Sequence, residues 1–93
     1  MIVGICQIVL YLPDSGSLKQ KRSLLKGMVT RVRNKFNVSV SEVGDQDLWQ
    51  KAQIGVAVVT NETRYANQVL SQVVNLVETQ DRLELIDYTL EML

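Results

Sequence analysis

The sequence contains no histidine and only one cysteine, and these absences exclude much of the chemistry that small proteins carry. A nucleophile activated by histidine needs the imidazole ring, and transition-metal sites are built mainly from histidine and cysteine. The lone Cys6 lies within an apolar run and has no partner for an internal disulfide, so we expect a buried and inert thiol. We therefore predict no metal site and no cofactor.

The sequence also lacks a long hydrophobic run. The apolar segment 1–12 is too short to span a bilayer, and it has neither the basic start nor the cleavage site of a signal peptide. We expect a cytoplasmic protein with no membrane partner. A chain of 93 residues suffices for one hydrophobic core but not for two, so a single domain over residues 1–93 is predicted.

Proline and glycine are scarce, and the only proline falls in the segment PDSGS, which ends a strand predicted over residues 2–12. Ser17 followed by Gln20 is a capping-box pattern, so a helix is predicted to start there. Its apolar stripe consists of Leu18, Leu25, Met28, Val29, Val32 and Phe36. Residues 37–43 and 48–60 are predicted to form an antiparallel hairpin around Gly44-Asp45.

A second helix is predicted after Thr60 or Asn61, either of which can cap it. Its inward side chains are expected to be Tyr65, Ala66, Val69, Leu70, Val73 and Val77. Residues 82–93 are predicted to form a last strand, whose broken alternation indicates a bulge or a frayed end. The order β-α-β-β-α-β predicts an α+β, ferredoxin-like fold, in which a four-stranded antiparallel sheet carries both helices on one face.

The other face of that sheet would carry no helix, and its expected side chains are largely apolar: Val3, Ile5, Val9, Tyr11, Trp49 and Val59. An uncovered apolar face most often meets a second copy of the same chain, so we predict a homodimer. Tyr11 ends the first predicted strand and Trp49 begins the third, so the two rings are expected side by side. We favour a dimer or sheet-packing cluster for them, with a base-stacking platform as the alternative.

Negative charge is absent from residues 15–41, which carry seven Lys or Arg residues, although the whole chain balances ten basic against ten acidic residues. The rest of the chain, with three basic residues and all ten acids, therefore carries −7. Like charges at i,i+4 destabilise a helix, so such a segment needs a polyanionic partner or acids brought near by tertiary contact. We predict nucleic-acid contact, with a solvated basic face or another acidic partner as alternatives. The predicted contacts form one helical stripe of Lys19, Arg22, Lys26 and Arg33, with Lys21 and Arg31 as further candidates.

The segment GDQDLWQK holds the other concentration of polar groups. Asp45 and Asp47 could serve as a general acid and base or bind Mg²⁺, but no nucleophile lies nearby in the sequence. We favour a structural role, in which Asp47 pairs with a basic residue such as Lys21 and anchors the hairpin to the helix. No catalytic residue is predicted. The aromatic signature of RNA-recognition motifs and the GxxG loop of KH domains are absent, so any RNA contact is expected to be with the backbone.

Three stretches carry a family resemblance: MIVGICQIVLYLP, SLKQKRSLLKGMVTRVRNKFNVSVSEV and QDLWQKAQIGVAVV. Over essentially its entire length the chain resembles the YlxP-like family of small bacterial proteins of unknown function. The resemblance implies a ferredoxin-like fold and a cytoplasmic protein often encoded beside translation initiation factor 2 and ribosome-binding factor A. It implies a link to ribosome biogenesis or translation by association only, and no catalytic residues. The family's motif residues here would be Ser17, Leu18, Lys19, Lys21, Arg22, Gln46, Asp47, Trp49 and Gln50.

Three hypotheses of function follow. The leading one is a non-enzymatic module, associated with RNA or the ribosomal subunits, whose basic helix lies against rRNA phosphates. The second is a homo-oligomeric protein-interaction or regulatory module whose basic helix meets an acidic protein surface. The third, an acylphosphatase-like hydrolase, is remote because residues 13–22 lack a glycine-rich phosphate cradle.

Overall fold

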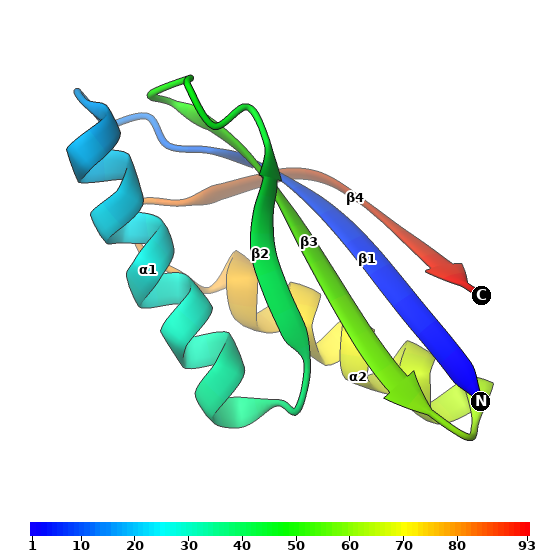
Figure 1. The fold of residues 1–93 in the computed structure, drawn as a ribbon. Helices are drawn as coiled ribbons and strands as arrows, with labels where there is room; N and C mark the ends of the chain where they lie inside the picture. Colours follow the sequence, from blue (N-terminus) through cyan, green and yellow to red (C-terminus); the bar gives the residue numbers. More distant parts are fainter.

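The computed structural model describes residues 1–93 as one α+β sandwich (Figure 1). Its elements are β1 (Ile2–Tyr11), α1 (Leu18–Lys35), β2 (Ser39–Gly44), β3 (Lys51–Thr60), α2 (Thr63–Glu78) and β4 (Glu84–Met92). The strands form one sheet in the order β2-β3-β1-β4, and every neighbouring pair is antiparallel. This arrangement confirms the predicted ferredoxin-like fold. Neither helix combines the length and apolarity needed to cross a membrane.

The hydrophobic core lies between the sheet and the two helices. Alternate residues of a strand point to opposite faces, so one face of β1 buries Cys6, Ile8 and Leu10 and the matching face of β3 buries Ile54, Val56 and Val58. The apolar stripes of both helices cover this face, with Leu25, Met28 and Val32 from α1 and Ala66, Val69, Leu70, Val73, Val74 and Val77 from α2. The opposite face of the sheet carries no helix and is called the open face below.

The start of α1 forms a variant of the predicted capping box, in which Ser17 caps the helix and Gln20 bonds to the residue before the cap. The Ser17 hydroxyl accepts a hydrogen bond from the Gln20 N–H at 3.1 Å, and the Gln20 side chain accepts one from the Gly16 N–H at 2.7 Å. Together these bonds satisfy two backbone donors at the beginning of the helix. The helix ends at Lys35 because Phe36 is extended, with φ at −129°.

Two details of α2 differ from the prediction. Its N-cap is Glu62, which makes no side-chain capping bond, so neither Thr60 nor Asn61 caps the helix. Tyr65 is 53% exposed and does not face inward. At 100° per residue Tyr65 lies just outside one edge of the buried stripe, and Val74, which was not predicted to face inward, is buried at the opposite edge.

A register shift causes the broken alternation of the last strand, so of the two predicted causes, a bulge or a frayed end, the structure shows the bulge. Val9 of β1 lies opposite Asp87, whereas Leu10 lies opposite Leu85, so Ile86 is an extra residue in β4. Ile86 is consequently 58% exposed. A second shift leaves Val43 unpaired between Glu42 and Gly44 of β2.

The prediction that Trp49 begins the third strand is wrong, because β3 begins at Lys51. Asp45 adopts a left-handed conformation with φ at 58°, and its carbonyl accepts a hydrogen bond from the Leu48 N–H at 3.0 Å. These two features hold the β2–β3 connection in a turn. Trp49 therefore lies beyond the end of the sheet.

Candidate nucleic-acid interface

The seven basic residues of α1 fall into two groups of different environment. Six are exposed and one, Lys21, is fully buried. The six exposed residues are Lys19, Arg22, Lys26, Arg31, Arg33 and Lys35. The basic helix is thus mainly a surface feature, with a single basic side chain pointing into the fold.

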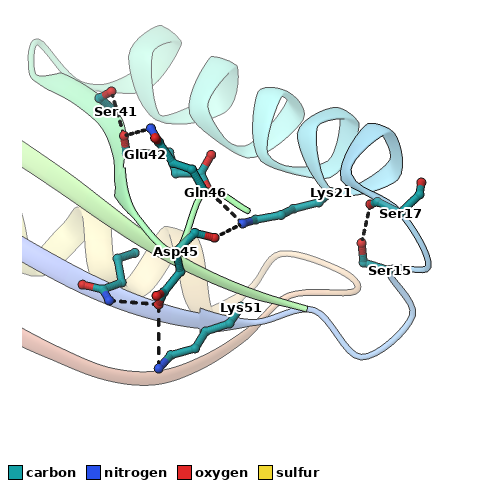
Figure 2. A network of polar contacts seen from close by, with 9 residues as sticks. Ser15, Ser17, Lys21, Ser41, Glu42, Asp45, Gln46 and Lys51 are labelled. Carbon is teal, nitrogen blue, oxygen red and sulfur yellow. Dashed lines mark hydrogen bonds and ion pairs between the residues drawn. The ribbon is translucent and has the colours of Figure 1, made fainter. Parts of the chain in front are cut away.

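Lys21 is a structural anchor between α1 and the hairpin (Figure 2). Its Nζ lies 2.8 Å from Glu42 Oε2 and donates a hydrogen bond to the Asp45 carbonyl at 2.7 Å. An ammonium with 0% exposure cannot touch a phosphate, so the prediction that Lys21 contacts nucleic acid is wrong. The predicted partner is also wrong, since Asp47 is exposed on the turn and Glu42 takes its place.

The signal for Glu42 was present in the sequence. Val38, Val40 and Glu42 alternate along the second strand, which places the carboxylate on its inward face. Helical spacing at 100° per residue likewise places Lys21 within the apolar sector of α1. An inward acid and an inward lysine on two elements that pack together predict a buried ion pair.

The four residues of the predicted stripe lie along one flank of α1, and this set (Lys19, Arg22, Lys26 and Arg33) is called the basic stripe below. This flank faces β2, because the Arg33 guanidinium donates a hydrogen bond to the Val40 carbonyl of that strand at 3.0 Å. On the opposite flank, Arg31 donates to the Gln80 side chain at 2.7 Å, beyond the end of α2. The basic stripe therefore follows the side of α1 next to the edge strand β2.

None of the six exposed basic residues has an acidic partner. The structure contains two ion pairs, Lys21 with Glu42 and Lys51 with Asp45, and only the first involves α1. The acceptors of Arg31 and Arg33 are an amide and a carbonyl, which leave both guanidinium charges uncompensated. The first turn of α1 also contains no acid. The basic side chain of Lys19 in this turn therefore lies at the positive end of the helix dipole without a compensating negative charge.

The two aspartates of the hairpin turn have different surroundings. Asp45 Oδ2 accepts a hydrogen bond from Gln53 at 2.9 Å and lies 3.7 Å from Lys51 Nζ. Asp47 is exposed and takes part in no ion pair. The two carboxylates therefore share no polar partner, and no group of three or more acidic or cysteine side chains could hold a metal ion.

The polar motif residues have identifiable structural contacts. Ser17 caps α1, as described above. The Gln46 amide donates to the Glu42 carbonyl at 3.3 Å, and the Gln50 amide donates to the Pro13 carbonyl at 3.2 Å. These bonds hold the hairpin turn against β2 and against the loop that precedes α1.

The apolar residues predicted for a dimer interface fall into two areas of the open face. Val3 pairs with Val59 at one end of the sheet, and Ile5 lies next to them on β1. Tyr11, Trp49 and the partly buried Val9 belong to the other end, where Tyr11 pairs with Lys51. A hydrogen bond of 3.2 Å between the side chains of Gln7 and Gln53 crosses the face between the two areas.

Cys6 is buried on the helix side of β1, with 2% of its surface exposed. Removal of the thiolate from water raises the pKa of this thiol from 9.0 to about 11. At neutral pH the side chain is therefore a protonated, apolar core residue.

The fold and its exposed charges define a class of protein: a ferredoxin-like domain with an uncompensated basic helix. The chain belongs to the family described as "Protein of unknown function (DUF503)", which matches residues 3–90. It is similar to the "Uncharacterized protein YlxP" of Bacillus subtilis (strain 168), with 42% identity over 79 residues that cover 85% of this chain and 84% of that protein. This similarity confirms the family resemblance seen in the sequence.

A comparison with solved structures supports the fold alone. The structure titled "De novo designed protein Foldit4" covers 100% of this chain and 97% of its own, with a TM-score of 0.56. Its sequence is only 9% identical, so no functional residue transfers from it.

Proposed function

We propose that this protein is an RNA-binding module that contacts phosphates through the basic stripe of α1 and performs no catalytic step. The observation that carries the proposal is the set of six exposed basic side chains on one helix, none of which has an acidic partner in the fold. An anion bound along the helix would supply the missing counter-charge. A polyanion suits a long stripe better than a single phosphate does.

The energetic argument rests on charge pairs within the helix. Arg22 and Lys26 stand at i,i+4, as do Arg31 and Lys35, and each like-charge pair of this kind costs about 0.2–0.5 kcal/mol. Among the basic residues of α1, only Lys21 has its charge compensated by a tertiary contact, the ion pair with Glu42. Within the basic stripe, Arg22 and Lys26 keep their mutual repulsion in the free protein, and contact with phosphates would remove it.

Phosphate contacts position a protein on RNA without reading its sequence, so we expect little preference for sequence from α1 itself. The setting that the family resemblance implies makes ribosomal RNA and the ribosomal subunits the first partners to test, in the cytoplasm. A basic helix could also meet an acidic protein surface, but such a partner would not respond to nuclease.

The test compares two variants with the same change in net charge. Lys19→Gln/Arg22→Gln/Lys26→Gln removes three cations from the basic stripe, and Lys35→Gln/Arg64→Gln/Arg82→Gln removes three exposed cations elsewhere. Affinity for 30S subunits and for a structured RNA is measured by filter binding at low salt. The proposal predicts a large loss for the first variant and a small loss for the second. Equal affinities of the wild type and the stripe variant would refute it.

A further inference from the structure

An exposed aromatic surface lies at one end of the open face, and its residues come from three separate parts of the chain. Tyr11, Leu48, Trp49 and Ile86 line an open hollow of about 540 Å³, together with Gln50 and Lys51. We call the four apolar side chains of this hollow the aromatic end. Trp49 is 55% exposed and Ile86 is 58% exposed, so both present apolar surface to water. Ile86 reaches this position because the β4 bulge turns it out of the strand's alternation.

A polar chain separates the aromatic end from the apolar surface at Val3 and Val59. Gln7 donates to Gln53 at 3.2 Å, Gln53 donates to Asp45 at 2.9 Å, and Asp45 lies 3.7 Å from Lys51. The open face is therefore not one continuous apolar patch suited to a single sheet-to-sheet contact. The aromatic end is a site of its own.

Hydrogen bonds hold the aromatic end beside the start of α1. The Leu12 N–H donates to the Gln50 carbonyl at 2.8 Å, and the Gln50 side chain returns a bond to the Pro13 carbonyl at 3.2 Å. The residue next to Trp49 is thus fixed to the loop that leads into α1. The bond from Lys21 to the Asp45 carbonyl ties α1 to the same turn (Figure 2). In Figure 1 the β2–β3 turn, the end of β1 and the start of α1 lie together.

One cation lines this hollow, and others lie on the helix that is bonded to the same turn. Lys51 lines the hollow with its side chain half exposed, and Lys19 and Arg22 of the basic stripe lie in the first turns of the adjacent helix. Flat aromatic rings beside Lys and Arg side chains match a nucleobase and its flanking phosphates, because every base offers a face for stacking. Acidic residues border the other sides, with Glu84 opposite Tyr11 and Asp47 exposed on the turn. Phosphates would therefore approach from the α1 side.

We propose that the aromatic end stacks a base of a single-stranded nucleic acid whose phosphates continue along the basic stripe. The inference rests on the proposed function and adds the substrate class to it. A duplex keeps its bases stacked on one another, whereas a single strand can turn one base out onto Trp49. The strand would pass around the end of the molecule, from the first turns of α1 to the open face.

The single tryptophan makes the site directly observable, since all tryptophan emission comes from Trp49. A twelve-nucleotide single-stranded RNA is titrated into the wild type, and a twelve-base-pair RNA duplex is titrated in parallel. The proposal predicts that the single strand quenches the emission and the duplex does not. Loss of one stacked base weakens binding by about 5- to 150-fold, which is the expected effect of Trp49→Ala on the single strand, measured by anisotropy of a labelled RNA. Trp49→Ala should leave duplex affinity unchanged.

The matched control is Tyr65→Ala, which removes another aromatic side chain of similar exposure from α2. It should leave both affinities unchanged. If the wild type binds neither RNA, the proposed function fails. If the wild type binds RNA but Trp49 emission and the Trp49→Ala affinity show no effect, this inference alone is overturned. A blue shift of Trp49 emission with rising protein concentration, without RNA, would assign the aromatic end to a second copy of the chain and also overturn it.

Discussion

Lys21 and Glu42 form an ion pair of 2.8 Å between α1 and β2 in which the ammonium is completely buried. Glu42 Oε2 is buried as well, and Lys21 is its only polar partner. The pair explains why one basic side chain of α1 points inward while the other six remain exposed. It also separates the structural charge of this helix from the charge that is available to a partner.

Removal of one member of this pair should destabilise the protein strongly. Lys21→Met leaves a carboxylate with one buried, unpaired oxygen, and Glu42→Leu leaves a fully buried ammonium, so each should lower the free energy of unfolding by about 3 kcal/mol. The double variant removes both charges and should lose clearly less than the sum, as measured by urea unfolding. Lys51→Met serves as control, because its pair with Asp45 is half exposed at 3.7 Å and should contribute at most about 1 kcal/mol. Additive effects of Lys21→Met and Glu42→Leu would contradict the account.

The buried thiol should make stability depend on alkaline pH. The pKa of Cys6 is raised by burial to about 11 from 9.0, so the folded state holds its proton where the unfolded state loses it. Its stabilising contribution is complete below pH 9 and is lost as the pH rises toward 11, by about 3 kcal/mol. The difference in unfolding free energy between the wild type and Cys6→Ala should therefore shrink over this window. A constant difference would show that the thiol ionises equally in both states.

The fold was predictable because strand and helix periodicity, the capping box at Ser17 and the turn at Gly44-Asp45 all agreed on one order of elements. Even the β4 bulge had a signal in the broken alternation around Ile86. The predicted Asp47–Lys21 pair is wrong because Asp47 lies on the exposed turn, whereas strand alternation places Glu42 on the inward face of β2, next to Lys21. The position of Trp49 depended on the left-handed Asp45, and a non-glycine residue with positive φ has no reliable signal in sequence.

The candidate site also has a part that the sequence predicts and a part that it does not. The basic stripe was predictable because helical spacing alone determines which side chains share a flank. The aromatic end was only half predictable: Tyr11 and Trp49 were expected side by side, and they line one hollow. Leu48 and Ile86 were missed, since their positions follow from a turn and a bulge that tertiary hydrogen bonding determines.

Self-association through the other end of the open face remains a prediction. Val59 is 64% exposed beside Val3, so it presents apolar surface that a second copy could cover. If a homodimer uses this area, Val59→Glu should weaken it at least tenfold without changing the monomer's unfolding free energy. Sedimentation equilibrium of the wild type and this variant measures the effect, with Tyr65→Glu on α2 as the control. A wild type that stays monomeric at high concentration would contradict the prediction.

The central claim is that the basic stripe of α1 neutralises phosphates, and the salt dependence of RNA binding tests it most directly. For a single strand the slope of log Kobs against log salt is about −0.7 for each phosphate neutralised. Lys19→Gln/Arg22→Gln/Lys26→Gln removes three contacts and should flatten the slope by about 2, while Lys35→Gln/Arg64→Gln/Arg82→Gln should leave it nearly unchanged. Equal slopes for the wild type and the stripe variant would show that these side chains do not touch the RNA.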